Sequence, residues 1–123
     1  MAILTYENLV DPLLRNVRQS LVDFSGMKAG DSVLDVCCGT GAQVIEYGRR
    51  RINATGIDLD ENMLAFAFKN KSLLKMENIA FSQADATALS FKDKSFDFVS
   101  VSFALHDKPH DIRNAVVSEM KRV

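Results

Sequence analysis

Three aspartates and two glycines carry the strongest chemical signal in this sequence of 123 residues. Asp35 closes an apolar run just before a turn that holds Gly39 and Gly41, and Asp58 and Asp85 each follow a later apolar run. A carboxylate accepts hydrogen bonds from hydroxyl and amino groups and attracts cations, while glycine lets the backbone approach a ligand closely. The pattern therefore predicts a binding site for a small molecule that carries hydroxyl, amino or cationic groups.

Apolar runs alternate with helical segments along the chain, and this order decides where the aspartates lie. The predicted strands cover residues 32–38, 52–60, 78–85 and 96–105, and the predicted helices cover 11–26, 42–51, 61–76 and 109–123. Such alternation gives parallel strands with crossover helices, and ligands bind beyond the carboxyl ends of these strands. We therefore expect an α/β fold, with an N-terminal helical segment at 1–26 and a core domain at 27–123.

Apolar residues at helical spacing mark one face on two of the predicted helices. In the first helix these residues are Leu13, Val17, Leu21 and Phe24. In the third helix they are Met63, Phe66 and Leu74. The first stripe predicts a helix, and we expect the stripe of Met63, Phe66 and Leu74 to face the core.

The composition excludes several functional classes. The 15 basic and 16 acidic residues leave a net charge of −1, which provides no basic surface for nucleic acid. The apolar runs are too short to span a membrane, and the start of the sequence lacks the pattern of a signal peptide. Cys37 and Cys38 are the only cysteines, and a bridge between neighbours would be strained, so we expect buried thiols and a cytoplasmic protein.

Two features favour S-adenosylmethionine over a nicotinamide dinucleotide as the ligand. S-adenosylmethionine carries a sulfonium, an ammonium, a ribose and an adenine amine, which match acids at three successive strand ends. A pyrophosphate would instead be repelled by Asp35. The dinucleotide fingerprint also needs a third glycine for close helix–strand packing, and Val44 occupies that position.

Several segments, in the right order, resemble the class I S-adenosylmethionine-dependent methyltransferases that act on small molecules. The segments are VLDVCCGTG, TGIDLDENML, QADATALSFKDKSFDFVSVSFALHD and EMKRV. The resemblance covers about residues 27–123. The double cysteine is similar to the branch of the family that methylates carbon atoms of quinones, so the resemblance implies methyl transfer to a small-molecule acceptor.

The same resemblance assigns nine residues to the cofactor. Its methionine end would be surrounded by Asp35, Gly39 and Gly41, and its ribose would be held by Asp58. Its adenine would contact Leu59, Asp85 and Ala86, and its methionyl part would be lined by Ser102 and Phe103. Cys37 replaces the usual glycine of the family, which is expected to narrow the pocket slightly.

The resemblance also implies a Rossmann-like parallel sheet in which this chain forms the first part. The family has a seven-stranded sheet of order 3-2-1-4-5-7-6, and the four predicted strands supply the order 3-2-1-4. We therefore expect a fragment of a longer protein, with strand four as an uncovered sheet edge. A homodimer that pairs through this edge is the alternative.

Catalysis is the least determined part of the sequence. His106 is a candidate general base beside the transferred methyl group, and Tyr6 is a candidate for a segment that folds over the cofactor. Pro109 interrupts the histidines and aspartates of HDKPHD, so we expect Asp107 to cap a helix there and no metal site. A non-catalytic binding module of the same fold and a nicotinamide-binding domain remain as alternative functions.

Overall fold

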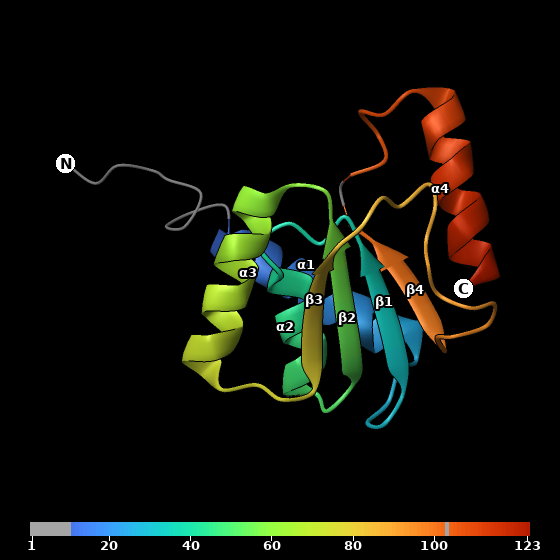
Figure 1. The fold of residues 1–123 in the computed structure, drawn as a ribbon. Coiled ribbons are helices and arrows are strands. Elements are labelled where there is room, and N and C mark those ends of the chain that lie inside the picture. Colours follow the sequence, from blue (N-terminus) through green and yellow to red (C-terminus); the bar gives the residue numbers. More distant parts are fainter. Residues whose placement is uncertain (1–10, 103) are drawn as a thin grey trace.

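The computed structural model describes residues 11–102 and 104–123, which form one sheet with helices on both faces (Figure 1). In chain order the elements are α1 (Asp11–Ser25), β1 (Ser32–Val36), α2 (Ala42–Arg49), β2 (Asn53–Asp58), α3 (Glu61–Leu74), β3 (Ile79–Gln83), β4 (Phe98–Val101) and α4 (His110–Arg122). No helix in these two ranges is long and apolar enough to cross a membrane.

The four strands are parallel and have the order β3-β2-β1-β4, which confirms the predicted sheet. All four therefore end at the same edge, as the arrowheads in Figure 1 show. In the register of the sheet, Asp35 on β1 lies opposite Gly56 on β2 and Ser100 on β4. The aspartate thus occupies the middle of the sheet, with a strand on each side.

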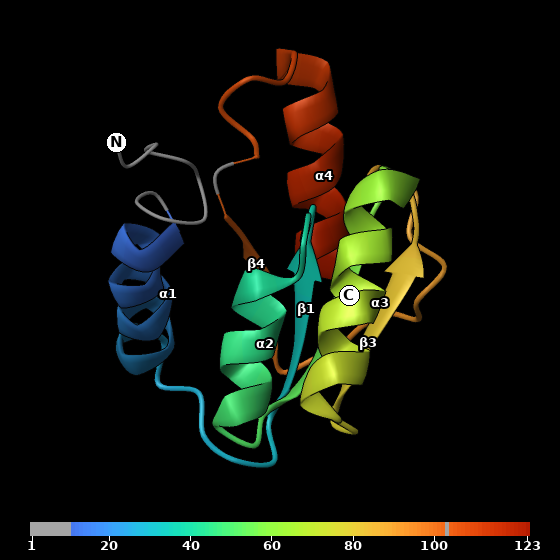
Figure 2. The same ribbon diagram turned by 90° about the vertical axis from the view of Figure 1, so that its left-hand side faces the viewer.

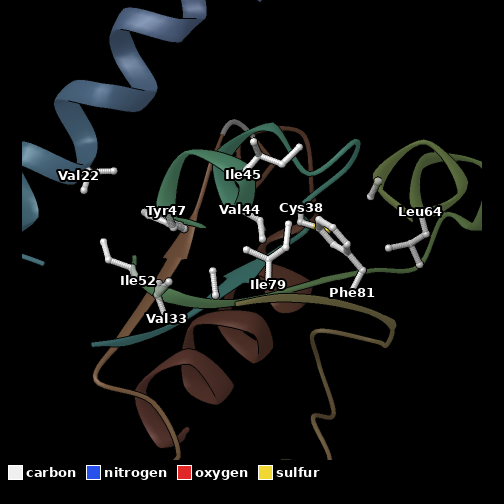
Figure 3. Packing of buried hydrophobic residues seen from close by; sticks show 12 residues of the cluster. Val22, Val33, Cys38, Val44, Ile45, Tyr47, Ile52, Leu64, Ile79 and Phe81 are labelled. Atoms are coloured by element: carbon white, nitrogen blue, oxygen red, sulfur yellow. The ribbon is translucent and has the colours of Figure 1, made fainter. Parts of the chain in front are cut away.

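Two apolar clusters pack on the opposite faces of the sheet. The first joins Val22 of α1, Val44 of α2 and Leu64 of α3 to the strands, and Figure 3 shows it extending across these three helices. The second includes Leu34 of β1 and Val116 of α4. Figure 2 accordingly shows α1 and α2 on one side of the strands and α4 on the other. Because side chains alternate along a strand, Asp35 faces the side of the first cluster.

A glycine on β2 resolves the packing problem that Val44 creates for the helix after the glycine turn. Val44 is fully buried, and a Cβ atom built on Gly56 would lie 2.8 Å from Val44 Cγ2 and 2.8 Å from Cys38 Sγ. Dinucleotide-binding folds obtain close helix–strand packing from a glycine on the helix. Here the small residue stands on the strand, so α2 can carry a valine and still approach the sheet.

Helix α1 is present as predicted, but two residues of the apolar stripe that indicated it are exposed. Val17 is 50% exposed and Phe24 is 93% exposed, whereas Val22 is buried. The side chain of Leu13 lies outside the described residues. Helix α1 packs against α2 through the neighbouring stripe that contains Val22, and a helical period alone does not distinguish two adjacent stripes.

The predicted core stripe of α3 is wrong. Met63, Phe66 and Leu74 are exposed, whereas Leu64 and Ala67 are buried against the sheet. The small side chain of Ala67 lets α3 approach β3 closely, and the larger residues lie beside this contact. Their position brings them to cavities instead of the core.

One charged network fastens the loop between β3 and β4 to α4. Arg122 donates hydrogen bonds to the carbonyl groups of Leu89 and Phe91 and to the carboxylates of Asp93 and Glu119. The Leu89 N–H donates to Glu119 Oε2 at 2.7 Å. The hydrogen bonds from Arg122, which have the larger effect, and from the Leu89 N–H lower the pKa of Glu119 to about 2. The network fixes the course of the chain that follows Asp85.

We predict that Gly56→Ala destabilises the protein by about 1–3 kcal/mol, because the new methyl group overpacks the contact between α2 and β2. The measurement is urea unfolding of Gly56→Ala, Val44→Ala and the double variant. Val44→Ala removes one of the clashing atoms, so the double variant should lose less stability than the sum of the two single losses. Strictly additive losses would show that the two residues do not compete for space.

Candidate functional site

Two adjacent cavities open at the carboxyl ends of the strands. One has a volume of about 390 Å³ and is lined by Asp35 and Gly39, and the other has a volume of about 320 Å³ and is lined by Asp58 and Asp85. Cys37 and Met63 line both cavities, and we call the pair together the strand-end cleft. The three aspartates of the sequence analysis therefore meet at one cleft.

Asp35 is a buried acid at the wall of the first cavity. It is 2% exposed, and the Ser100 hydroxyl donates a hydrogen bond to its Oδ1 atom at 2.8 Å. Burial raises the pKa of Asp35 to about 7, the charge of Asp58 adds to this effect, and the bond from Ser100 opposes it. A cation placed beside this carboxyl group would favour its ionised form.

Ser100 links Asp35 to a second buried group. The Tyr47 hydroxyl of α2 donates to Ser100 Oγ at 2.8 Å, and Ser100 in turn donates to Asp35. Burial raises the pKa of Tyr47 to about 12, so its hydroxyl remains a donor. The chain of hydrogen bonds connects α2, β4 and β1 and fixes the orientation of the Asp35 carboxyl group.

Asp58 braces the glycine turn as well as lining the cleft. The Gly39 N–H donates to its Oδ2 atom at 2.8 Å, and the Asp60 N–H donates to its Oδ1 atom at 2.9 Å. Each carboxylate oxygen can accept more than one hydrogen bond. Asp58 therefore retains acceptor capacity for a ligand while its orientation is set by the backbone.

The two glycines of the turn serve different purposes. Both have positive φ, at +56° for Gly39 and +82° for Gly41. A Cβ atom at Gly39 would meet nothing within 4 Å, whereas one at Gly41 would lie 2.5 Å from the ring of Phe81. Only Gly39 thus keeps space open at the cleft, and Gly41 is required by packing inside the protein.

The far end of the cleft contains Asp85, Ala86 and Leu59. Asp85 is exposed, and its Oδ1 atom accepts hydrogen bonds from the N–H and the hydroxyl group of Thr87, which lower its pKa. Leu59 is exposed and free to pack against a flat ring. This end suits a planar group with an amino substituent.

The remaining residues predicted from the sequence differ in whether they line the cleft. Ser102 lines the cavity of Asp35, while Phe103 and Tyr6 lie outside the described residues. His106 is exposed and lines neither cavity of the cleft. Asp107 lines the cleft and does not cap α4, whose first turn has no side-chain cap. Among the residues that the structure describes, no three potential ligands cluster as for a metal ion.

Several residues that line the cleft were not predicted from the sequence as site residues, among them one from each of three helices. Arg18 of α1 is 8% exposed and lines the cavity of Asp35, together with Gln43 of α2 and Met63 of α3. The available signal for Arg18 was its spacing, four residues from both Leu14 and Val22. An arginine within such a stripe is more often a surface residue, because its charged end usually reaches water.

Cys37 stands at the junction of the two cavities in a strained conformation. Its φ angle is +58°, in the left-handed region that favours glycine. Its side chain is half-buried and the Cys38 side chain is buried, and both thiols are free. A cysteine at this position therefore adds a side chain to the cleft at a conformational cost.

The cleft combines groups that suit one extended, partly cationic ligand. A buried carboxyl group and an arginine lie at one end, the braced carboxylate of Asp58 lies in the middle, and the apolar Leu59 lies with the exposed carboxylate of Asp85 at the other end. Such an arrangement binds and orients a molecule. No described side chain of the Asp35 cavity is a histidine, lysine or glutamate that could act as a base.

Comparison with known proteins places the sequence among enzymes. The family model described as a methyltransferase domain matches residues 33–123. Demethylmenaquinone methyltransferase from Staphylococcus aureus (strain JH9) is 38% identical over 109 residues, which cover 86% of this chain and 44% of that protein. The chain thus spans less than half the length of this curated relative.

Solved structures share the fold. The PH0226 protein from Pyrococcus horikoshii OT3 matches with a TM-score of 0.84 and 25% identity, over 94% of this chain and 50% of that one. Phosphoethanolamine N-methyltransferase 2 from Haemonchus contortus, solved in complex with S-adenosyl-L-methionine, matches with a TM-score of 0.73 and 26% identity, over 87% of this chain and 26% of that one.

We predict that Asp35→Asn changes the pH dependence of stability of the free protein. Folded wild type keeps the Asp35 proton up to a pKa of about 7, whereas the unfolded chain releases it at 3.8. Wild-type stability therefore falls as the pH rises from about 4 through 7, by at most about 4 kcal/mol, because a tenfold change in proton affinity corresponds to about 1.4 kcal/mol. The variant lacks this titration and should exceed wild type in stability at alkaline pH.

The measurement is urea unfolding of wild type, Asp35→Asn and Asp97→Asn at acidic and alkaline pH. Asp97 is an exposed acid at the opposite end of the sheet, where it accepts a hydrogen bond from the Ser32 N–H. It controls for the loss of one carboxylate. The prediction is contradicted when wild type and Asp35→Asn keep the same difference in unfolding free energy at every pH.

We also predict that Cys37→Gly is more stable than Cys37→Ala, by about 1 kcal/mol. Both changes remove the thiol, but only glycine relieves the positive φ angle. Urea unfolding of the two variants at one pH measures the difference. An alanine variant as stable as the glycine variant would mean that the backbone at this position is not strained.

Proposed function

The chain belongs to the methyltransferase domain family, and on that premise we propose that it binds S-adenosylmethionine for methyl transfer to a small molecule. The observation that carries the proposal is the buried carboxyl group of Asp35, which faces a cavity in the same cleft as Asp58 and Asp85. Burying an acid costs free energy unless a partner favours its charged form. The cationic amino-acid end of the cofactor is a suitable partner.

The residues present fit the other groups of the cofactor. Asp58 has acceptor capacity for the ribose hydroxyl groups, and the open space at Gly39 admits the ligand beside the turn. Leu59 would pack on the adenine ring, while Asp85 would accept a hydrogen bond from its amine and Ala86 would offer a backbone N–H. Ser102 lines the methionine end.

S-adenosylmethionine, when bound, supplies a methyl group on a positively charged sulfur. The chain's own contribution is to hold and orient the cofactor and to keep water from the reacting end. A cation beside Asp35 would favour its ionised form over the protonated form that burial favours in the free protein, and the Tyr47–Ser100 hydrogen bonds hold its carboxyl group in place. His106 as a general base and Tyr6 as part of a covering segment stay predictions.

We further propose that the acceptor is the ring of a quinone or a similar aromatic compound. Two observations support this class: the relative at 38% identity is named a demethylmenaquinone methyltransferase, and the double cysteine resembles the quinone-methylating branch. The activity belongs to the whole protein, since the chain spans 44% of that relative. A binding module without turnover would bind the cofactor and methylate nothing.

The same proposal extends to the location and assembly of the protein. We propose a cytoplasmic protein, since both cysteines are free thiols. We also propose that it does not bind nucleic acid, since a net charge of −1 provides no basic surface. We also propose a homodimer that pairs through β4 at the edge of the sheet, as the alternative to further strands of a longer protein covering this edge. An open groove of about 580 Å³ runs beside β4 and contains Val99, Val101 and Val117.

The first test is calorimetry with S-adenosylhomocysteine and NADH. Wild type should bind S-adenosylhomocysteine and not NADH. Asp58→Ala should weaken this binding by about 1.5–3 kcal/mol, because hydrogen bonds to a charged acceptor are lost.

Asp97→Ala is the matched control for this experiment. It removes a carboxylate that also accepts a backbone N–H, but at the opposite end of the sheet. Its affinity should equal that of wild type. Absence of S-adenosylhomocysteine binding by wild type, or equal losses in the two variants, would contradict the proposed site.

A further inference from the structure

We infer that Arg18 binds the carboxylate at the amino-acid end of the cofactor and so selects ligands that carry this group. The inference rests on the proposed function. It assigns a residue to the carboxylate of the cofactor's amino-acid end, whose ammonium is assigned to Asp35. Arg18 of α1 is more than nine-tenths buried, and it lines the same cavity as Asp35. Arg18 of α1 and Asp35 of β1 thus place a cation and an acid at the wall of the same cavity.

The chemistry of the ligand requires both signs of charge. An amino-acid end carries an ammonium and a carboxylate, and Asp35 can satisfy only the ammonium. A carboxylate that enters a cavity loses its water and needs donors in return. An arginine offers several N–H donors in a planar fork that matches the two oxygens of a carboxylate.

The local structure holds Arg18 beside the start of α2. Gln43, which is itself buried, donates from Nε2 to the Arg18 carbonyl at 3.3 Å. Helix α2 has Gly41 at its N-cap, no side-chain cap and no acidic residue in its first turn. Thr40 and Ala42 from this start line the cavity with Arg18. The backbone N–H groups of the first turn add a favourable field for an anion to the guanidinium charge.

A neighbouring arginine on the same helix provides a matched comparison. Arg15 lies one turn before Arg18, is exposed, and lines the adjoining cavity between α1, α2 and α3 without lining the cavity of Asp35. Arg18 lines both. Removal of either residue changes the net charge equally, so a difference between the two variants reports position.

The experiment compares three ligands by calorimetry. S-adenosylhomocysteine has the complete amino-acid end, its decarboxylated analogue keeps the amine alone, and 5′-methylthioadenosine lacks both groups. Arg18→Met keeps the length of the buried stem and removes the charge. It should weaken S-adenosylhomocysteine by about tenfold to a hundredfold, as expected for charge-assisted hydrogen bonds, and leave the other two ligands within about threefold of wild type.

The controls separate binding from folding. Arg15→Met should bind all three ligands as wild type does, and Arg18→Lys should lose less S-adenosylhomocysteine affinity than Arg18→Met. If Arg18→Met misfolds, it loses affinity for all three ligands together. In that case the test is whether Arg18→Lys loses more affinity for S-adenosylhomocysteine than for the other two ligands. Equal losses for all three ligands in folded Arg18 variants, or no loss, would overturn the inference alone. Failure of wild type to bind S-adenosylhomocysteine would overturn the proposed function with it.

Discussion

The structure depends on one costly placement, a carboxyl group buried in the middle of a parallel sheet. Asp35 lies between Gly56 and Ser100 in the register, and its only hydrogen-bond donor in the described residues is the Ser100 hydroxyl. Burial raises the pKa of this group to about 7, so a large fraction of it stays protonated near neutral pH in the free protein. A site of this kind stores the capacity to bind a cation, because the arriving charge makes ionisation favourable.

The rest of the fold brings the other groups of the cleft to this acid. Parallel pairing ends β1 and β2 at the same edge, and the bond from Gly39 to Asp58 fastens the glycine turn to β2. Gly56 lets α2 approach the sheet despite Val44. Close packing therefore sets the geometry of the cleft, while the polar groups at its wall set what it can bind.

The alternation of strands and helices predicted a parallel sheet, and the resemblance to the methyltransferase family supplied the strand order 3-2-1-4. The acids could be predicted because they terminate apolar runs. The sequence did not predict which helix stripe is buried, since α1 and α3 each carry two adjacent apolar stripes and the neighbouring element chooses between them. Phe24 and Phe66 are exposed for this reason, and Val22 and Ala67 are buried. Arg18 escaped prediction because only tertiary packing distinguishes a buried arginine from one that reaches solvent.

The central claim is that the cationic end of the cofactor displaces the proton of Asp35. Calorimetry of S-adenosylhomocysteine binding in buffers of different ionisation enthalpy counts the protons released. Just below the pKa of about 7, wild type should release a large fraction of one proton, and Asp35→Asn should release none. Binding by wild type with heats independent of the buffer would contradict the claim, because Asp35 would then keep the same protonation state in both the free and the bound protein.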